Sequence, residues 1–281
     1  MVNIDVSAVR VRHSWPPFPR VPVSLVLLFV LVLTCFVGPL FSQSPTSINV
    51  LNTFAGFSNS HWLGTDELGR DLLARVLVGG RLSLAVAGGS VVTAFVVGTL
   101  WGVMAASSRG LLDEVLMRTA EVSMSIPQIL FALVCVSAFG ASIASLVLIV
   151  GLCLSPTTAR MTRTVVIQEM GLDYFLAGIA CGTRRWRLML LEVLPNTSSA
   201  ILSQTVINAA SAIILEASLS FVGLGVQPPG SSLGTLLQQG YGYLYSDPLY
   251  AVPPAVCILL TVVLLNLGAT RLDGSRRGIS A

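Results

Sequence analysis

The sequence predicts an all-α integral membrane protein with six transmembrane helices, and its composition is the first reason. Of its 281 residues, 54% are hydrophobic and 10% are charged, and the mean hydropathy is +0.83. An average soluble protein carries about 25% charged residues, so this chain has more apolar surface than a water-soluble core can bury. The second reason is that the apolar residues fall in long uncharged runs, and a spanning helix needs about 20 such residues.

The first two runs lie in the N-terminal part of the chain. Residues 21–41 follow three arginines, are too long for the apolar part of a signal peptide and lack a clean small-x-small cleavage site. We therefore expect an uncleaved membrane anchor there. Residues 82–106 carry no charge between Arg81 and Arg109 and predict the second span. The segment between the two spans, 42–81, is then an extracytoplasmic loop.

The third and fourth spans share one uncharged stretch between Glu121 and Arg160. This stretch is long enough for two helices, and the glycine-containing segment 139–142 is the natural break between them. We therefore place spans at 116–138 and 143–160. Each contains one proline, which membrane helices tolerate as a kink when neighbouring groups satisfy the freed carbonyl.

Two further runs complete the predicted core of five helices at 82–270. The fifth span is placed at 196–216 and the sixth at 248–269. The segment between them, 218–247, is almost uncharged as well, but Gly, Pro, Ser and Gln dominate it and favour turns over a spanning helix. We expect an extracytoplasmic loop that lies against the membrane surface.

The arginines predict the orientation, because cytoplasmic segments are enriched in positive charge. All sixteen basic residues are arginine. An N-in, C-in arrangement puts the segment 1–20, the tail 271–281 and most arginines on the cytoplasmic side, and the reverse arrangement would invert this bias. The cytoplasmic or interfacial arginines are Arg10, Arg12, Arg20, Arg109, Arg118, Arg160, Arg163, Arg184, Arg185, Arg187, Arg271, Arg276 and Arg277, and the external ones are Arg70, Arg75 and Arg81.

A charged cytoplasmic segment at 161–194, here called the coupling loop, interrupts the apolar runs. Asp173 stands where a helix N-cap is wanted, and Gly182 can end that short helix in the left-handed conformation. A second helix carrying Arg184 and Arg185 follows and ends at Pro195, which suits the first turn of the next span. Such a compact helical segment indicates a docking surface for a partner, although an interfacial loop anchored by arginines would give the same pattern.

The segment 61–75 predicts a loop that enters an amphipathic helix. Thr65 or Asp66 can cap the helix, and Arg70, Asp71 and Arg75 can form ion pairs at helical spacing. We favour a structural cap on the outer face over direct contact with a ligand.

Three polar residues in or beside the fifth span are candidates for a substrate path. Gln204 and Asn208 lie one turn apart and could line a path, or they could bond to a neighbouring helix, which is the commoner role. Glu216 lies at the edge of the span, where a charge is expensive and should face protein or water. A salt bridge or a capping role near the outer interface is the alternative to contact with substrate.

Several chemical functions are excluded. The chain has no lysine, so it cannot build a P-loop that reaches the terminal phosphates of a nucleotide. The five cysteines are scattered without a Cys-x-x-Cys pair, the two histidines lie far apart, and no basic tract indicates nucleic acid. We find no catalytic or metal-binding constellation and expect a chain that is not an enzyme.

Three sequence blocks resemble the dipeptide, oligopeptide and nickel family of binding-protein-dependent ABC importer permeases, in particular the C-type subunit. The blocks are the segments 61–71 and 216–229 and a set of coupling-loop positions. In that loop Leu176 and Gly178 replace the glutamate and the second alanine of the family's motif, while the matching residues are Ala177, Gly182, Leu194 and Pro195.

The resemblance, which covers roughly residues 60–270, implies a type I ABC importer permease fold in a bacterial plasma membrane. It implies that the coupling loop contains a coupling helix docked in a cleft of an ATP-binding subunit. ATP and Mg would belong to two such subunits or domains, with no cofactor on this chain. The other implied partners are a second homologous permease and an extracytoplasmic substrate-binding protein.

The implied cargo is a di- or oligopeptide. The same machine importing nickel or another small solute is the first alternative. An ion-coupled secondary carrier is the second, but such carriers place ionisable residues or unwound helices at the membrane midplane, and here only Glu216 lies near a span.

Overall fold

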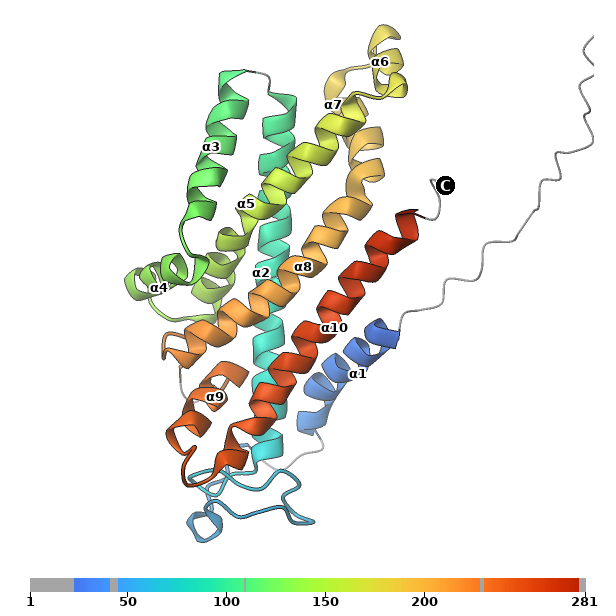
Figure 1. Ribbon diagram of the computed structural model, residues 1–281. Coiled ribbons are helices and arrows are strands. Elements are labelled where there is room, and N and C mark those ends of the chain that lie inside the picture. Colours follow the sequence, from blue (N-terminus) through green and yellow to red (C-terminus); the bar gives the residue numbers. More distant parts are fainter. Residues whose placement is uncertain (1–22, 41–44, 109, 228–229, 278–281) are drawn as a thin grey trace, which may run out of the picture.

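The computed structural model describes residues 23–40, 45–108, 110–227 and 230–277, and these residues form an all-helical bundle (Figure 1). Within them the only pairing of extended segments is an isolated bridge between Thr65 and Asp71. The helices are α1 (Val23–Val37), α2 (Leu72–Ser107), α3 (Leu111–Ser125), α4 (Gln128–Phe139), α5 (Ile143–Met170), α6 (Asp173–Ala180), α7 (Arg185–Leu188), α8 (Leu194–Phe221), α9 (Leu233–Gly242) and α10 (Val252–Arg277).

Five helical segments in the described part of the chain are long and apolar enough to cross a membrane. They begin at Val23, Leu72, Ile143, Arg185 and Pro248. The pair α3 and α4 is a sixth candidate if it counts as one bent span. The all-α membrane fold with up to six spans is therefore confirmed.

The third span differs from the single helix with a proline kink that was predicted at 116–138. α3 ends at Ser125, α4 begins at Gln128, and the two are bent by 92° relative to each other. Ile126 has an extended backbone, as residues before a proline prefer, and Pro127 cannot donate the amide that would continue the helix. The proline thus makes a sharp turn rather than a tolerated kink.

The second helix begins earlier than the predicted position 82, because the sequence supplies a cap. The Asp71 carboxylate accepts the backbone N–H of Ala74 at 2.8 Å, and α2 runs from Leu72 for 36 residues. Asp71 is therefore the cap, which corrects the expectation that Thr65 or Asp66 plays this role. A helix of this length spans about 54 Å, so it extends beyond the hydrocarbon layer.

Small residues let α2 and α5 pack closely along much of their length. A Cβ at Gly102 would lie 2.5 Å from the Ala159 carbonyl oxygen, and one at Gly151 would lie 2.5 Å from Thr93 Cβ. Close backbone approach of this kind is typical of helix pairs in membranes. Buried side chains of α2, α5 and α8, with Ala132 and Val136 of α4, form the main core.

The predicted loop at 218–247 contains more helix than its composition suggests. α8 continues to Phe221, and α9 follows from Leu233. Ser232 caps α9 and forms a reciprocal capping box with Thr235. A short 3-10 turn, Pro248–Tyr250, then leads into α10.

Some predicted features lie outside the described residues. They are the N-terminal segment 1–20 with its three arginines, Arg109, the prolines at 228–229 and positions 278–281 of the predicted tail.

Candidate functional site

Within the coupling loop, α6, the turn after it and α7 form a helix–turn–helix hairpin, residues 173–188, at one end of the bundle. α9 and the segment 45–71 lie at the other end (Figure 1). Gly182 has φ +82° and ends the first helix. The Gly182 N–H donates to the Ile179 carbonyl at 2.9 Å, and the Thr183 N–H donates to the Gly178 carbonyl at 3.0 Å. These two bonds are the Schellman pattern that glycine favours, so the predicted turn is present.

Asp173 is not the cap of this helix. Leu172 has the extended backbone of the N-cap position, and Asp173 is already the first helical residue without a capping bond from its side chain. An acidic group in the first turn still interacts favourably with the helix dipole.

The inner side of the hairpin has its own small core. Gly178 lies against Leu188, where an added Cβ would come within 2.8 Å of Leu188 Cδ2, so this glycine lets α6 approach α7 closely. The residues buried together here are Ala106 of α2, Val166 of α5, Phe175 of α6, Leu188 of α7, and Met189 and Val193 after it. The hairpin is therefore packed against the ends of α2 and α5.

The outer side of the hairpin is exposed and basic. The side chains of Ala177, Arg184 and Arg185 are exposed, and Trp186 leaves 60% of its surface uncovered. Arg187 is exposed as well. A large aromatic side chain among arginines is the composition that protein interfaces favour.

The second helix of the hairpin does not end at Pro195 as predicted. The stretch Arg185–Phe221 is one continuous helical segment of 37 residues. Met189–Val193 form a π turn, in which the Leu194 N–H donates to the Met189 carbonyl. Pro195 falls in the first turn of α8, where it is tolerated, but no break separates the basic helix from the span.

A polar contact that the sequence gave no reason to expect joins the hairpin to both neighbouring spans. The Tyr174 hydroxyl donates to Glu169 at 2.8 Å, and the Asn196 amide donates to the same carboxylate at 3.1 Å. Burial raises the pKa of the Tyr174 hydroxyl, the Asn196 contact lowers it and the Glu169 carboxylate raises it, with a net upward shift. The phenol thus stays a donor, and the contact holds α5, α6 and α8 together.

An ion pair braces the same end of the bundle. Arg163 of α5 donates through Nε and Nη2 to the two carboxylate oxygens of Asp113 on α3, at 2.6 Å each. This bidentate geometry fixes the end of α3, which otherwise has few buried residues.

Of the predicted path residues, Asn208 contributes to a contact between helices, and Gln204 bonds to Asn208 on its own helix. Asn208 is buried and donates to the Thr158 hydroxyl of α5 at 2.8 Å. Gln204 donates to the Asn208 oxygen at 3.0 Å. Neither lines the apolar cavity of about 330 Å³ between α3, α4 and α5, which is bordered by Trp101, Gln128 and Ser155 among others.

Glu216 lies inside α8 and is fully buried, rather than at an exposed edge of the span. It forms no ion pair with another described residue, and its described hydrogen bond comes from the Ser220 hydroxyl at 2.7 Å. The alternative of a salt bridge is therefore not what the structure shows.

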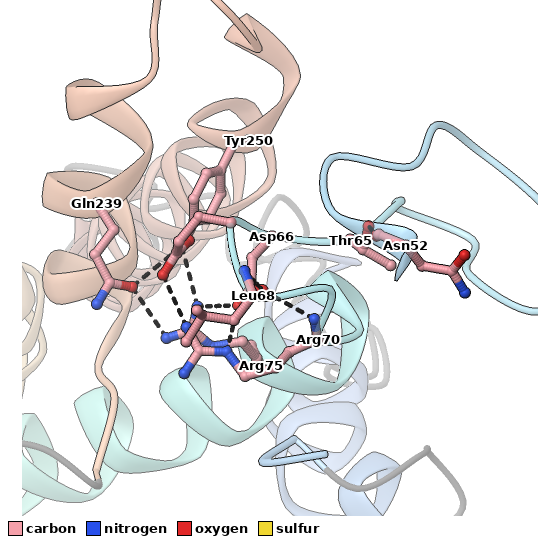
Figure 2. Close-up of polar contacts among 9 residues, drawn as sticks. Asn52, Thr65, Asp66, Leu68, Arg70, Arg75, Gln239 and Tyr250 are labelled. Carbon is pink, nitrogen blue, oxygen red and sulfur yellow. Dashed lines mark hydrogen bonds and ion pairs between the residues drawn. The ribbon is translucent and has the colours of Figure 1, made fainter. Parts of the chain in front are cut away.

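At the opposite end, the segment 61–75 is built into the fold by a buried polar network (Figure 2). Asp66, not Asp71, is the partner of both arginines: it accepts Arg70 Nε at 2.6 Å and Arg75 Nη1 at 2.5 Å. Arg75 also donates to Tyr250 and Gln239, at 3.0 Å each. The network joins α2 to α9 and the start of the last span, which supports the structural role that the sequence suggested.

In the part of the chain that the structure describes, no group of three or more His, Cys, Asp or Glu side chains is placed to hold a metal ion.

Comparison with known proteins is consistent across sequence and structure. The protein family described as the binding-protein-dependent transport system inner membrane component matches residues 98–278. The chain is 34% identical over 265 residues to the glutathione transport system permease protein GsiD of Pectobacterium atrosepticum, covering 91% of this chain and 87% of that protein.

Other relatives and a solved structure agree with this match. Identity is 37% over 205 residues to the di/tripeptide transport system permease protein DppC of Pseudomonas aeruginosa, covering 73% of this chain and 68% of that one. It is 30% over 250 residues to the probable D,D-dipeptide transport system permease protein DdpC of Escherichia coli, covering 89% and 84%. A chain of the inward-facing MetNI methionine ABC transporter superposes with a TM-score of 0.60 at 20% identity, over 72% of this chain and 95% of that one.

Proposed function

The chain belongs to the family of binding-protein-dependent transport system inner membrane components, and from that premise we propose that it is the permease subunit of an ATP-driven importer of di- and oligopeptides. In this role the chain performs no chemistry on its cargo. It opens and closes a path through the membrane when partner subunits move it.

One observation supports this proposal most directly: the exposed hairpin of the coupling loop is continuous with a transmembrane helix. Ala177, Arg184 and Arg185 are exposed on its outer side, and the helix that begins at Arg185 runs on to Phe221. A partner that binds the hairpin can therefore displace a span directly. We assign this binding to two ATP-binding subunits or domains, which would hold the ATP and Mg.

The charge distribution supports an N-in, C-in arrangement with the coupling loop in the cytoplasm. Arg184, Arg185 and Arg187 are exposed at the end where α6 and α7 lie. Toward the other end lie Arg70 and Arg75, both paired with Asp66, and the exposed Arg81. Cytoplasmic segments carry the excess of lysine and arginine, and most arginines of this chain lie in the segments assigned to that side.

The remaining partners follow from the same role. A second homologous permease would complete the path, and an extracytoplasmic substrate-binding protein would deliver cargo to the end where α9 lies. The three relatives named above are peptide or glutathione permeases by name, which favours peptides over nickel as cargo.

Co-purification with the ATPase tests the proposal, with two glycine variants. Gly182 and Gly140 both have positive φ, +82° and +85°, and an added Cβ would meet nothing within 4 Å at either site. Leucine brings backbone strain of about 1–2 kcal/mol to a left-handed turn such as the one at Gly182. The strain is greater at Gly140 in the α4–α5 turn, whose ψ of 152° lies in a region that essentially only glycine occupies, so Gly140→Leu is the more severe control. We expect Gly182→Leu to reduce ATPase co-purification roughly tenfold, since a loss of 1.4 kcal/mol is one decade in affinity.

Gly140→Leu should leave co-purification within about twofold, a difference of less than 0.5 kcal/mol. Equal retention of the ATPase by both variants would refute docking at the hairpin. Peptide uptake that survives Gly182→Leu would favour the ion-coupled carrier instead.

A further inference from the structure

Three polar side chains close a ring of hydrogen bonds where the hairpin meets α5 and α8 (Figure 1). The Tyr174 hydroxyl of α6 and the Asn196 amide of α8 both donate to Oε1 of Glu169 on α5, at 2.8 and 3.1 Å. The Asn196 amide also donates to the Tyr174 hydroxyl oxygen at 3.5 Å. Each member of the ring therefore contacts the other two, and each comes from a different helix.

The backbone connects α6 directly to α5 but not to α8. On one side, only Gly171 and Leu172 separate α6 from the end of α5. On the other side, the chain reaches α8 through the turn at Gly182, then α7, then the π turn at Met189–Val193. Such a π turn interrupts the regular hydrogen-bond ladder of a helix. A displacement of α6 thus has no short covalent route to α8.

The ring supplies the direction that apolar packing lacks. Phe175 of α6 shares the small core of the hairpin with Val166 of α5 and with Val193. Apolar burial stabilises such a core without a preferred direction. Hydrogen bonds depend on distance and angle, so the bonds between Tyr174, Glu169 and Asn196 fix how α6 is oriented on the two spans.

The ring lies where water can reach it. Glu169 and Tyr174 are half-buried, and Asn196 is exposed. When one partner of an accessible hydrogen bond is removed, water can satisfy the other, so little stability is lost. Variants of the ring should therefore fold, and their effect on movement can be measured separately from their effect on stability.

We propose that Glu169 is a positioning residue that joins the hairpin to α5 and α8 through Tyr174 and Asn196, so that a displacement of α6 moves both spans as one unit. This inference rests on the proposed function, because it needs a partner that moves the hairpin. It concerns the transmission of movement after docking. The exposed arginines of the outer side, Arg184 and Arg185, are other residues, so docking itself should not change.

The test uses the assembled transporter in proteoliposomes with its ATPase and binding protein, and it measures peptide transported per ATP hydrolysed. Glu169→Ala removes the shared acceptor, whereas Glu169→Gln keeps a carbonyl oxygen that can accept both bonds. Tyr174→Phe removes one donor and keeps the ring of the side chain. Ser198→Ala is the matched control near Asn196, because the Ser198 hydroxyl donates to the Pro195 carbonyl of its own helix at 2.6 Å.

We expect Glu169→Ala to lower transport per ATP roughly tenfold and Tyr174→Phe roughly threefold, which are coupling losses of ordinary size. Adding Tyr174→Phe to Glu169→Ala should lower it by less than about twofold more, because both changes break the same bond. Glu169→Gln and Ser198→Ala should stay within about twofold of the unmodified transporter. All of these variants should retain the ATPase on co-purification.

Three results would overturn the role given to Glu169. In the first, Glu169→Ala keeps normal transport per ATP, whether or not less complex assembles, so that the ring is purely structural. In the second, Glu169→Gln is as impaired as Glu169→Ala, so that the charge rather than hydrogen bonding matters. In the third, Glu169→Ala loses the ATPase on co-purification, so that the residue acts in docking.

Failure of the proposed function would look different. In that case the unmodified chain itself would neither retain the ATPase nor support peptide uptake, and the role of Glu169 would be overturned with it. Each of the three results above appears instead against a normal unmodified transporter.

Discussion

Arg75 and Asp66 form a buried ion pair, with Nη1 2.5 Å from Oδ2 and neither side chain more than 6% exposed. Asp66 also accepts the backbone N–H groups of Leu68 and Arg70 at 2.9 Å each. One carboxylate thus holds a loop in shape and neutralises an arginine that links α2 to α9 and the last span.

Removal of this carboxylate should be costly. Asp66→Ala leaves Arg75 buried without its counter-charge, and we expect a loss of about 3–5 kcal/mol in unfolding free energy, the usual penalty for breaking a buried pair. Thermal unfolding of the protein in nanodiscs measures the loss. Arg118→Ala is the control, because Arg118 pairs with Glu121 on an exposed surface and should cost less than about 1 kcal/mol. Similar losses for both would contradict the role given to Asp66.

Asn208 should contribute to stability through a bond between helices. Asn208→Ala removes the bond to Thr158 of α5, and we expect a cost of about 1 kcal/mol, typical of side-chain bonds inside membranes. A double-mutant cycle with Thr158→Ala isolates that bond. Additive effects of the two changes would show that the pair does not interact.

The packing of α2 on α5 should depend on where a methyl group is added. Gly102→Ala places a Cβ close to Ala159 and Thr162, whereas Gly88→Ala, on the same helix, meets nothing within 4 Å. We expect Gly102→Ala to destabilise the protein by about 1–3 kcal/mol through overpacking. Gly88→Ala should be neutral or slightly stabilising, because alanine has the higher helix propensity. Thermal unfolding of both variants measures their stabilities. If Gly88→Ala were the less stable of the two, the close α2–α5 contact at Gly102 would be excluded.

Cys181 offers a chemical probe of docking. It is exposed at the end of α6, while Cys35 and Cys153 are buried. A water-soluble maleimide should therefore modify Cys181 first in the isolated subunit, and bound ATPase should slow this reaction roughly tenfold or more by covering it. Peptide mapping by mass spectrometry measures the rate at each cysteine, and Cys181→Ser is the control. An unchanged rate at Cys181 in the complex would place the docking surface elsewhere.

Hydropathy predicted the membrane-spanning helices well, because spanning segments must be long, apolar and uncharged. It did not predict the helix ends and the short helix that lie outside the apolar runs. The start of α2 depends on the cap at Asp71, and the helix α9 depends on Ser232 with Thr235, which are local hydrogen bonds in polar sequence. The break at Pro127 was visible as a proline, but the extent of its 92° bend depends on packing.

The candidate site was predictable in part for the same reason. Gly182 marks the hairpin because glycine adopts positive φ readily, which is a property of one residue. The pairing of Glu169 with Asn196, and of Arg163 with Asp113, joins residues far apart in sequence. The choice of Asp66 over Asp71 as the partner of Arg75 likewise depends on how the loop folds back.

The π turn at Met189–Val193 changes the direction in which the residues before it face around the helix axis. A turn that closes on the fifth residue accommodates one residue more than an α-turn, so the helices on either side are out of phase by about 100°. Deletion of a single residue in this stretch would restore a regular helix and rotate Arg185 and Trp186 to another azimuth. The direction in which Arg185 and Trp186 point thus depends on the number of residues between them and α8, as well as on which residues these are.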